Sequence, residues 1–198
     1  MSRKDTITGI ILAGGASKRL NYKNKALLKI GGRSIIEHII NALSKVTESI
    51  VLSTNSPEQF EHLGLPTFKD ITPGSGSLGG IYTGLKISRT HHNLIIACDI
   101  PFIRSNFLKL LVNSREDYDV VVPVTPDGHQ PTCAIYSRNC LIPIEAQIDE
   151  GNLKISDLFP SVKVKRIDCY DSTMFFNINT HEDYLVALSM AIRYRDQE

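Results

Sequence analysis

The sequence predicts an α/β protein, built as a three-layer α/β/α sandwich around a mixed but mostly parallel sheet. Short runs typical of strands alternate with segments of helical periodicity along most of the 198 residues, which indicates parallel strands joined by crossover helices. The runs at 8–12 and 93–98 are largely apolar, as in strands covered on both faces. The alternation weakens in the last third of the chain, where we expect a less regular arrangement.

The predicted strands follow from these runs and from the turn-forming residues between them. Residues 162–167 alternate apolar and basic side chains, which is typical of a half-exposed edge strand, and residues 65–68 give a weaker pattern. The predicted strands are 8–12, 49–53, 65–68, 93–98, 119–123, 132–136 and 162–167.

The predicted helices alternate with these strands. In the first one, isoleucines and Leu43 recur at helical spacing, and Ser34 with Glu37 three residues later forms a capping-box pattern. The predicted helices are 34–43, 81–87, 102–112, 139–148, 155–159 and 182–194.

Composition excludes several classes of function. A formal net charge of +1, from 22 basic and 21 acidic residues, argues against a broad nucleic-acid-binding face. The longest apolar runs fall far short of a membrane span, and the run at 10–12 ends at Gly14, too early for a signal peptide. The four cysteines form no metal-binding spacing, so we expect reduced thiols in a cytoplasmic protein that binds neither membrane nor nucleic acid.

Ligands of open α/β sheets bind beyond the carboxyl ends of the strands. The first strand ends in two glycines, Gly14 and Gly15, which free the backbone to turn and let its N–H groups approach an anion. Ser17 adds a hydroxyl, Arg19 a planar guanidinium and Lys25 a mobile positive charge. The Walker A pattern is absent. We predict a phosphate-binding turn of another kind; a turn with ordinary surface charges is the alternative.

Asp99 follows directly on the apolar run at 93–98, and Pro101 stops the strand from continuing. A carboxylate in that position costs free energy unless it is paired or holds a cation. Mg²⁺ is often held by one or two carboxylates together with substrate phosphates. We predict that Asp99 binds Mg²⁺. An N-cap is the alternative, but Asp99 lies too early for a helix that begins near Arg104 or Ser105.

Asp70 precedes a stretch rich in glycine and serine at 71–80. The segment G-S-G-S-L-G within it matches the dinucleotide-binding pattern G-x-G-x-x-G. That pattern has to close a strand and open a helix directly, whereas Pro73 and its neighbours intervene here. We therefore reject a dinucleotide site and predict a flexible loop that faces a ligand.

Asn177 and Asn179 precede the last predicted helix, and they share one side if the chain is extended there. Thr180 is a good N-cap, with Asp183 placed to favour the helix dipole. A capped helix explains Thr180 but not the pair of asparagines, so both remain candidate binding residues.

Together these residues resemble the molybdenum cofactor guanylyltransferase family, within the nucleotidyltransferases of the sugar-nucleotide type. The matching segments follow the expected order between residues 7 and 185. They are Leu12-Ala13-Gly14-Gly15 with Ser17 and Arg19, Lys25-Ala26-Leu27-Leu28, Asp70, Gly79-Gly80, Cys98-Asp99-Ile100-Pro101-Phe102, Gln130-Pro131-Thr132 and Phe176-Asn177-Ile178-Asn179-Thr180.

The resemblance implies a Rossmann-like fold of the nucleotide-diphosphosugar transferase type in a single domain, 1–198. A nucleotide-binding part would cover about 1–115 and an acceptor-binding part about 116–198. The implied reaction transfers GMP from GTP to molybdopterin or Mo-molybdopterin and releases pyrophosphate, with Mg²⁺ as cofactor. Proteins that deliver or receive the cofactor are further expected partners.

The resemblance also implies residue roles. The expected catalytic residues are Arg19, Lys25 and Asp99, with Asp99 as the metal ligand. The expected nucleotide-binding residues are Leu12, Ala13, Gly14, Gly15, Ser17, Lys25, Asn55, Asp70 and Asp99. The expected acceptor-binding residues are Gly79, Gly80, Asn177 and Asn179.

Some positions depart from the family pattern. Leu20-Asn21 stands where Met-Gly is common, Asn24 where Asp usually precedes the lysine, and Ser77 where Pro is frequent. Three alternatives stay open: a CTP-dependent molybdopterin cytidylyltransferase, although that branch usually reads Leu-Ala-Ala-Gly, a sugar-1-phosphate nucleotidyltransferase, and a nucleotide-binding regulatory module without catalysis.

Overall fold

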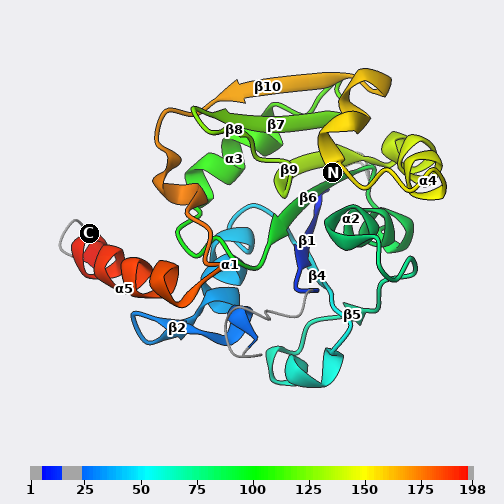
Figure 1. The fold of residues 1–198 in the computed structure, drawn as a ribbon. Helices are drawn as coiled ribbons and strands as arrows, with labels where there is room; N and C mark the ends of the chain where they lie inside the picture. The colour runs from blue at the N-terminus through cyan, green and yellow to red at the C-terminus, as the bar shows by residue number, and fades with distance from the viewer. Residues whose placement is uncertain (1–5, 15–23, 196–198) are drawn as a thin grey trace.

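The computed structural model describes residues 6–14 and 24–195. Within them the chain forms the predicted three-layer α/β/α sandwich (Figure 1). The α-helices are α1 (Ile35–Leu43), α2 (Gly76–Ile87), α3 (Ser105–Asn113), α4 (Leu141–Asp149) and α5 (His181–Arg195). The strands are β1 (Thr8–Leu12), β2 (Lys29–Ile30), β3 (Arg33–Ser34), β4 (Ser49–Ser53), β5 (Thr67–Phe68), β6 (His92–Ala97), β7 (Val120–Thr125), β8 (Gly128–His129), β9 (Cys133–Ser137) and β10 (Val164–Asp168).

Short 3₁₀ segments connect these elements. They are η2 (Lys25–Leu27), η3 (Pro57–Gln59), η4 (Glu61–Leu63), η5 (Arg138–Cys140), η6 (Ile155–Ser161) and η7 (Ser172–Phe175). In the part of the chain that is described, no helix is long and apolar enough to cross a membrane.

The main sheet has eight strands within the described residues, and β1 lies inside it, between β6 and β4. β4 and β6 run parallel to β1 on either side, with Leu12 level with Ser53 and Ala97. The three strands therefore end together at one edge. The strand order is β10-β7-β9-β6-β1-β4-β5, with β8 paired to β7.

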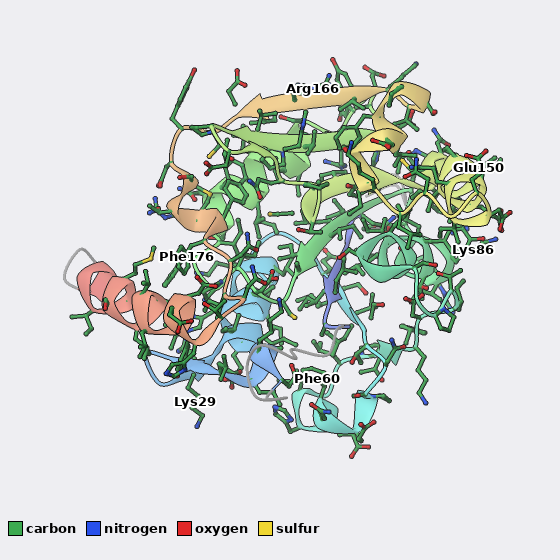
Figure 2. The ribbon with its side chains drawn as sticks, viewed as in Figure 1. Lys29, Phe60, Lys86, Glu150, Arg166 and Phe176 are labelled. Atoms are coloured by element: carbon green, nitrogen blue, oxygen red, sulfur yellow. The ribbon has the colours of Figure 1, made fainter. Side chains whose placement is uncertain are left out.

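β9 interrupts the parallel order, because it lies between β6 and β7 and runs antiparallel to both. The sequence pattern of 132–136 predicts a strand here but does not contain its direction. At the far edge, β10 pairs with β7 in parallel, as expected for an edge strand, and Arg166 projects from it at the outer boundary of the molecule (Figure 2).

Alternate side chains of the central strands supply two apolar cores. Ile11, Leu52 and Ile96 pack on one face, together with α1, α3 and the last buried residues of the chain. Ile10 and Ile95 pack on the other face against α2, α4 and η6, and Figure 1 shows α2 and α4 next to each other there. This period of two explains why both central strands are apolar throughout.

The structure corrects the prediction for the glycine-rich stretch. Residues 76–80 are not a flexible loop but the first part of α2, which begins at Gly76 rather than at residue 81. A Cβ atom at Gly84 would lie 2.8 Å from two carbon atoms of Ile10, and one at Gly80 would lie 3.1 Å from Leu12. The glycines therefore allow α2 to pack closely on β1, which the sequence pattern alone does not distinguish from loop flexibility.

The predicted helix caps are confirmed. Ser34 and Glu37 form the capping box of α1, and Thr180 with Asp183 forms the corresponding pair of α5. The small β2–β3 hairpin was not predicted, because two-residue strands have too little pattern. The Tyr184 hydroxyl donates to the carbonyl of Lys29 at 2.8 Å and so joins α5 to this hairpin.

Candidate active site

A cavity of about 350 Å³ lies where β1, β4 and β6 end. The N-terminal turn of α2 forms one wall, and residues that follow β4 and β5 form another. Its lining residues are Leu12, Gly14, Lys25, Ser53, Thr54, Asn55, Asp70, Gly74, Gly76, Ser77, Gly80, Ala97, Cys98 and Asp99. This cavity lies at the carboxyl edge of the sheet, where the sequence analysis predicts that ligands bind.

Asp99 is held rigidly at this edge. The backbone N–H of Cys98 donates to the carbonyl of Leu12 at 3.0 Å, and the N–H of Ile178 donates to the carbonyl of Asp99 at 3.0 Å. The side chain is 15% exposed. Its Oδ2 atom lies 2.6 Å from Nζ of Lys25, while Oδ1 is buried and has no hydrogen-bond partner among the described residues.

A buried carboxylate oxygen without a donor favours a cation at that position. Within the described residues no group of three His, Cys, Asp or Glu side chains could bind a metal ion. A metal ion on Asp99 therefore needs ligands from its substrate, which is how Mg²⁺ commonly binds beside phosphates. The donor set fits the predicted Mg²⁺ on this basis.

Lys25 is the second charged group of the cavity. It begins η2, where the side chain of Asn24 accepts a hydrogen bond from the N–H of Ala26 at 3.1 Å. Its ammonium group donates to Asp99 and also to Oδ1 of Asn179, at 3.3 Å. Lys25, Asp99 and Asn179 are far apart in the sequence, and the fold brings them together.

The side chains of Asn177 and Asn179 have different hydrogen-bond partners. Asn179 reaches Lys25, whereas the side chain of Asn177 donates to the carbonyl of Phe175 at 3.1 Å. Neither of them lines the cavity. Asp183 accepts from the backbone N–H groups of Asn179 and Thr180, at 2.9 and 2.8 Å, and these bonds hold the pKa of Asp183 below its usual value.

Asn55 and Asp70 lie in the cavity wall formed after β4 and β5. The N–H of Asp70 donates to Oδ1 of Asn55 at 3.2 Å. Thr83, in the middle of α2, donates its hydroxyl to Oδ1 of Asp70 at 3.0 Å. Thr83 is fully buried within a helix, and no sequence signal marked it.

The predicted glycines have different positions. Gly14 and Gly80 line the cavity, and a Cβ on Gly14 would meet no atom of the described residues within 4 Å. Gly79 is buried in α2, where a Cβ would lie 2.7 Å from Oγ1 of Thr72. Ala13, also predicted, is buried, and its N–H donates to the carbonyl of Ser53 at 2.8 Å.

Three predicted residues, Gly15, Ser17 and Arg19, lie outside the described residues, as do the departures Leu20 and Asn21. Ser53 lines the cavity but was not predicted to bind a ligand. Its position could have suggested this role, because it ends a predicted strand at the carboxyl edge of the sheet. Cys98 also lines the cavity, but burial raises the pKa of its thiol to about 12, so it stays protonated and is no nucleophile at neutral pH.

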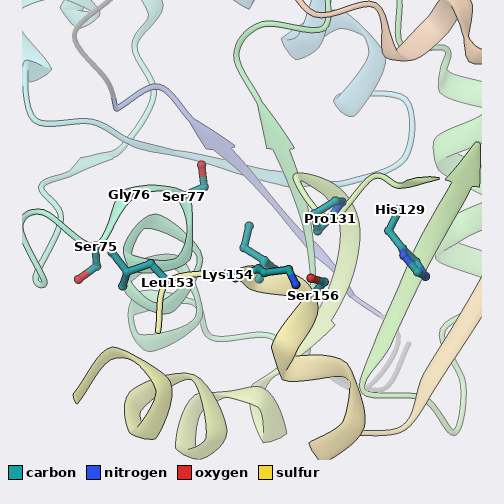
Figure 3. A pocket seen from close by; sticks show the side chains of 9 residues that line it. Ser75, Gly76, Ser77, His129, Pro131, Leu153, Lys154 and Ser156 are labelled. Atoms are coloured by element: carbon teal, nitrogen blue, oxygen red, sulfur yellow. The ribbon is translucent and has the colours of Figure 1, made fainter. Parts of the chain in front are cut away.

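A second cavity, of about 410 Å³, adjoins the first one (Figure 3). The two share Gly76 and Ser77 at the start of α2. Its opposite side carries Lys154 and Ser156 at the beginning of η6, with Pro131 before β9. The site therefore has room for two ligands side by side.

Comparison with known proteins gives the family. The model of the MobA-like NTP transferase domain matches residues 9–162, which include the central sheet and Asp99. The chain belongs to this family. Within it, the chain is a nucleotidyltransferase, and the predicted resemblance is confirmed.

The relatives of this MobA-like NTP transferase carry a consistent name. A protein of Desulfosudis oleivorans called "Molybdenum cofactor guanylyltransferase" is 35% identical over 187 residues, covering 90% of this chain and 93% of the relative. One of Clostridium perfringens (strain 13 / Type A), called "Probable molybdenum cofactor guanylyltransferase", is 38% identical over 185 residues, covering 88% and 92%.

A solved structure supports the fold of this NTP transferase. The molybdopterin-guanine dinucleotide biosynthesis protein A of Archaeoglobus fulgidus superposes with a TM-score of 0.79 at 23% identity. The match covers 94% of this chain and all of the other. The predicted Rossmann-like sandwich of the nucleotide-diphosphosugar transferase type is therefore confirmed.

Proposed function

We propose that this chain is a molybdenum cofactor guanylyltransferase, which transfers GMP from GTP to molybdopterin or Mo-molybdopterin and releases pyrophosphate. One observation carries the proposal: beside Lys25, in a cavity at the ends of the central strands, Asp99 has a buried oxygen that no described residue hydrogen-bonds. The names of relatives that match nine-tenths of the chain support the same assignment.

In this proposal Asp99, together with phosphates of the nucleotide, would hold Mg²⁺, and the ion would supply Lewis-acid chemistry for the transfer. Asp99 would place that cation at the carboxyl edge of β6, next to Lys25. Lys25 lies close enough to neutralise charge on the departing pyrophosphate. The open space at Gly14 lets backbone approach the nucleotide closely. Gly15, Ser17 and Arg19, the other predicted phosphate-binding residues, lie outside the described residues.

The reaction needs no general base, because the acceptor phosphate is already an anion. One of its oxygens attacks the α-phosphorus of GTP, a new P–O bond forms, and the bond to the β-phosphate oxygen breaks. The protein mainly aligns the two substrates and excludes water. The adjoining cavity offers room for the acceptor, and the acceptor-binding candidates include Asn179, which contacts Lys25, and Gly80, which lines the first cavity.

A single incubation tests this function. The protein is mixed with GTP, Mg²⁺ and molybdopterin, and the products are analysed by mass spectrometry together with a pyrophosphate assay. We expect the guanine dinucleotide and one equivalent of pyrophosphate. Turnover with CTP in place of GTP would instead make the chain a cytidylyltransferase, and turnover with a sugar 1-phosphate would assign it to that class.

A thermal-shift panel gives an independent answer without the acceptor. A ligand at 100 times its Kd stabilises a protein by about 2.7 kcal/mol. For a chain of this size that corresponds to a rise in Tm of roughly 5–10 °C. We expect GTP with Mg²⁺ to give the largest rise, and no rise with any nucleoside triphosphate would remove the basis of the proposal.

A further inference from the structure

Helix α5 is apolar on more sides than the described residues cover. Among residues 185–192 the only polar one is Ser189. One side of the helix, with Tyr184, Ala187 and Ala191, packs on the same core as α1 and α3. A helix that is apolar all round is normally buried all round. The outer side of α5 therefore lacks the cover that its residues favour.

The outer side of α5 carries three large apolar side chains. Leu185, Val186 and Ile192 are 51%, 48% and 67% exposed. Leu185, Ser189 and Ile192 follow one another at the spacing of one helix face, so they form a stripe along the helix, with Val186 beside it. Elsewhere in the described residues, exposed large apolar side chains occur one to a segment, which is ordinary for a protein surface. The gathering of three of them on α5 indicates an interaction surface.

Ser189, in the middle of this stripe, can be covered by a partner at little cost. Its hydroxyl donates to the carbonyl of Leu185 at 3.1 Å, so the proton already has an acceptor within the helix. A polar group that keeps its hydrogen bond loses little when water is excluded. The side chain is also small, and the distance between two packed helices depends on the side chains at their contact. A second helix can therefore approach closely at this point.

The segments outside the described residues have the wrong composition to cover the stripe. Residues 1–5, 15–23 and 196–198 are mostly polar and charged, and their only large apolar residues are Met1, Leu20 and Tyr22. Residues 15–23 also begin directly after Gly14, which lines the cavity at the end of β1. This composition favours a separate molecule as the cover of α5.

The charges at the two ends of α5 fit a second copy of the same helix. Its first turn contains Glu182 and Asp183, and its last turn contains Arg193 and Arg195. When two copies pack in antiparallel directions, the acidic turn of each lies beside the basic turn of the other, and the helix dipoles attract. Parallel directions would bring equal charges together. A membrane surface is disfavoured, because a helix that binds one needs a polar side, whereas the inner side of α5 packs on the core.

We propose that α5 is a self-association surface, on which a second copy of this chain packs its own α5 in the antiparallel direction. A two-fold axis passes near Ser189, and both copies contribute the same residues. The helix has 15 residues and is about 22 Å long. One side of it is smaller than the ~800 Å² per partner of a standard interface, so the dimer is weak and dissociates on dilution. α5 lies beyond residues 9–162, which match the family model, and the proposal does not depend on the substrates.

Analytical ultracentrifugation of the full chain between ~1 and ~300 µM gives the first test, in the range expected for a small interface. We expect the mass to rise with concentration from 22.0 kDa towards twice that value. Leu185→Glu and Ile192→Glu should each raise the Kd at least ~10-fold, because a charge is then buried without a partner. Glutamate is a good helix former, so both variants should keep the wild-type circular dichroism.

The matched control is Ile142→Glu, which places the same charge on a residue that is 79% exposed. It lies on α4, which packs on the opposite face of the sheet from α5, as Figure 1 shows. This variant should dimerise like the wild type. A wild type that stays monomeric at ~300 µM, or a dimer that Leu185→Glu and Ile192→Glu leave intact, would overturn the proposal. So would an equal loss of the dimer in Ile142→Glu.

A charge exchange tests the antiparallel direction. Glu182→Lys and Arg195→Glu should each weaken the dimer roughly 2- to 10-fold at low salt, the range of a few exposed ion pairs. The double variant should recover the wild-type Kd, because its two ends again carry opposite charges. Both substitutions are unfavourable for the dipole of their own helix, so a recovery comes only from the second copy. A double variant weaker than either single one would exclude the antiparallel pair.

Discussion

The two carboxylate oxygens of Asp99 have different surroundings, since Oδ2 pairs with Lys25 and Oδ1 is buried with no donor from the part of the chain that the structure describes. We expect Asp99→Ala to reduce kcat/KM roughly 100-fold or more, as removal of one electrostatic contact to a transition state does. The substitution also removes a negative charge that is largely buried. We therefore expect the variant to stay folded, which circular dichroism measures. Asp149→Ala, at the exposed end of α4, is the control. Near-normal turnover of Asp99→Ala with Mg²⁺ would contradict the assignment.

Lys25 and a divalent cation would compete for the same carboxylate. We therefore expect Lys25→Met to bind Mn²⁺ several-fold more tightly than the wild type when no nucleotide is added, although its turnover falls. Electron paramagnetic resonance of free Mn²⁺ measures the affinity directly and does not depend on activity. Unchanged or weaker Mn²⁺ binding would mean that Asp99 is not the metal ligand.

At the residue scale, the sequence predicts many of the residues that line the cavity but not the contacts between them. Gly14, Asp70 and Asp99 were named because they follow predicted strands, and the edge of a parallel sheet collects such residues, whereas Lys25 was named for its charge and from the family resemblance. The contact of Asn179 with Lys25 joins residues 154 positions apart, which no local pattern contains. The same holds for Thr83, whose role depends on where α2 packs.

In helix α2, packing against β1 explains the choice of residues better than helix propensity does. Alanine favours a helix interior over glycine by about 1 kcal/mol. At Gly84, however, the new Cβ would lie 2.8 Å from Ile10, and forcing a methyl group into a packed core costs about 1–3 kcal/mol. We expect Gly84→Ala to lower the free energy of unfolding in urea. A gain in stability would show that α2 can move away from β1 at no cost.

The start of α5 should be sensitive to acid. Hydrogen bonds from the N–H groups of Asn179 and Thr180 lower the pKa of Asp183 in the folded protein. A lowered pKa gives stability that is present above the unfolded value of about 3.9 and is lost as pH falls through the folded value. Asp183→Asn should therefore differ from the wild type in urea unfolding at pH 7 and approach it below about pH 4. A constant difference at all pH values would contradict this origin.

The elements that the sequence predicted are those with their own periodicity. α1, α5 and the central strands appear within a few residues of the predicted bounds, because apolar spacing and caps define them. The start of α2 was not predicted, because glycines have no side chains and so cannot show the apolar spacing that marks a helix. The direction of β9 was missed because a strand pattern is the same in both directions.

Across the whole molecule, the four cysteines are buried, and none forms a disulfide bond. Burial raises the pKa of Cys98 and Cys140 to about 12 and raises those of Cys133 and Cys169 as well. We expect almost no reaction with Ellman's reagent in the native protein at pH 8 and four reactive thiols in guanidinium chloride. Rapid reaction of a native thiol would indicate that part of the core opens readily.

The antiparallel strand β9 limits which segments can be exchanged between this chain and its relatives in chimeric proteins. A cut near residue 115 looks natural along the sequence, but β9 would then be missing from the open side of β6, where Leu94, Ile95 and Ile96 are fully buried. The severed first half would present a strand edge that invites aggregation. Chimeras that exchange acceptor halves should therefore keep β6 and β9 from the same parent, even though 35 residues of other structure separate them along the chain.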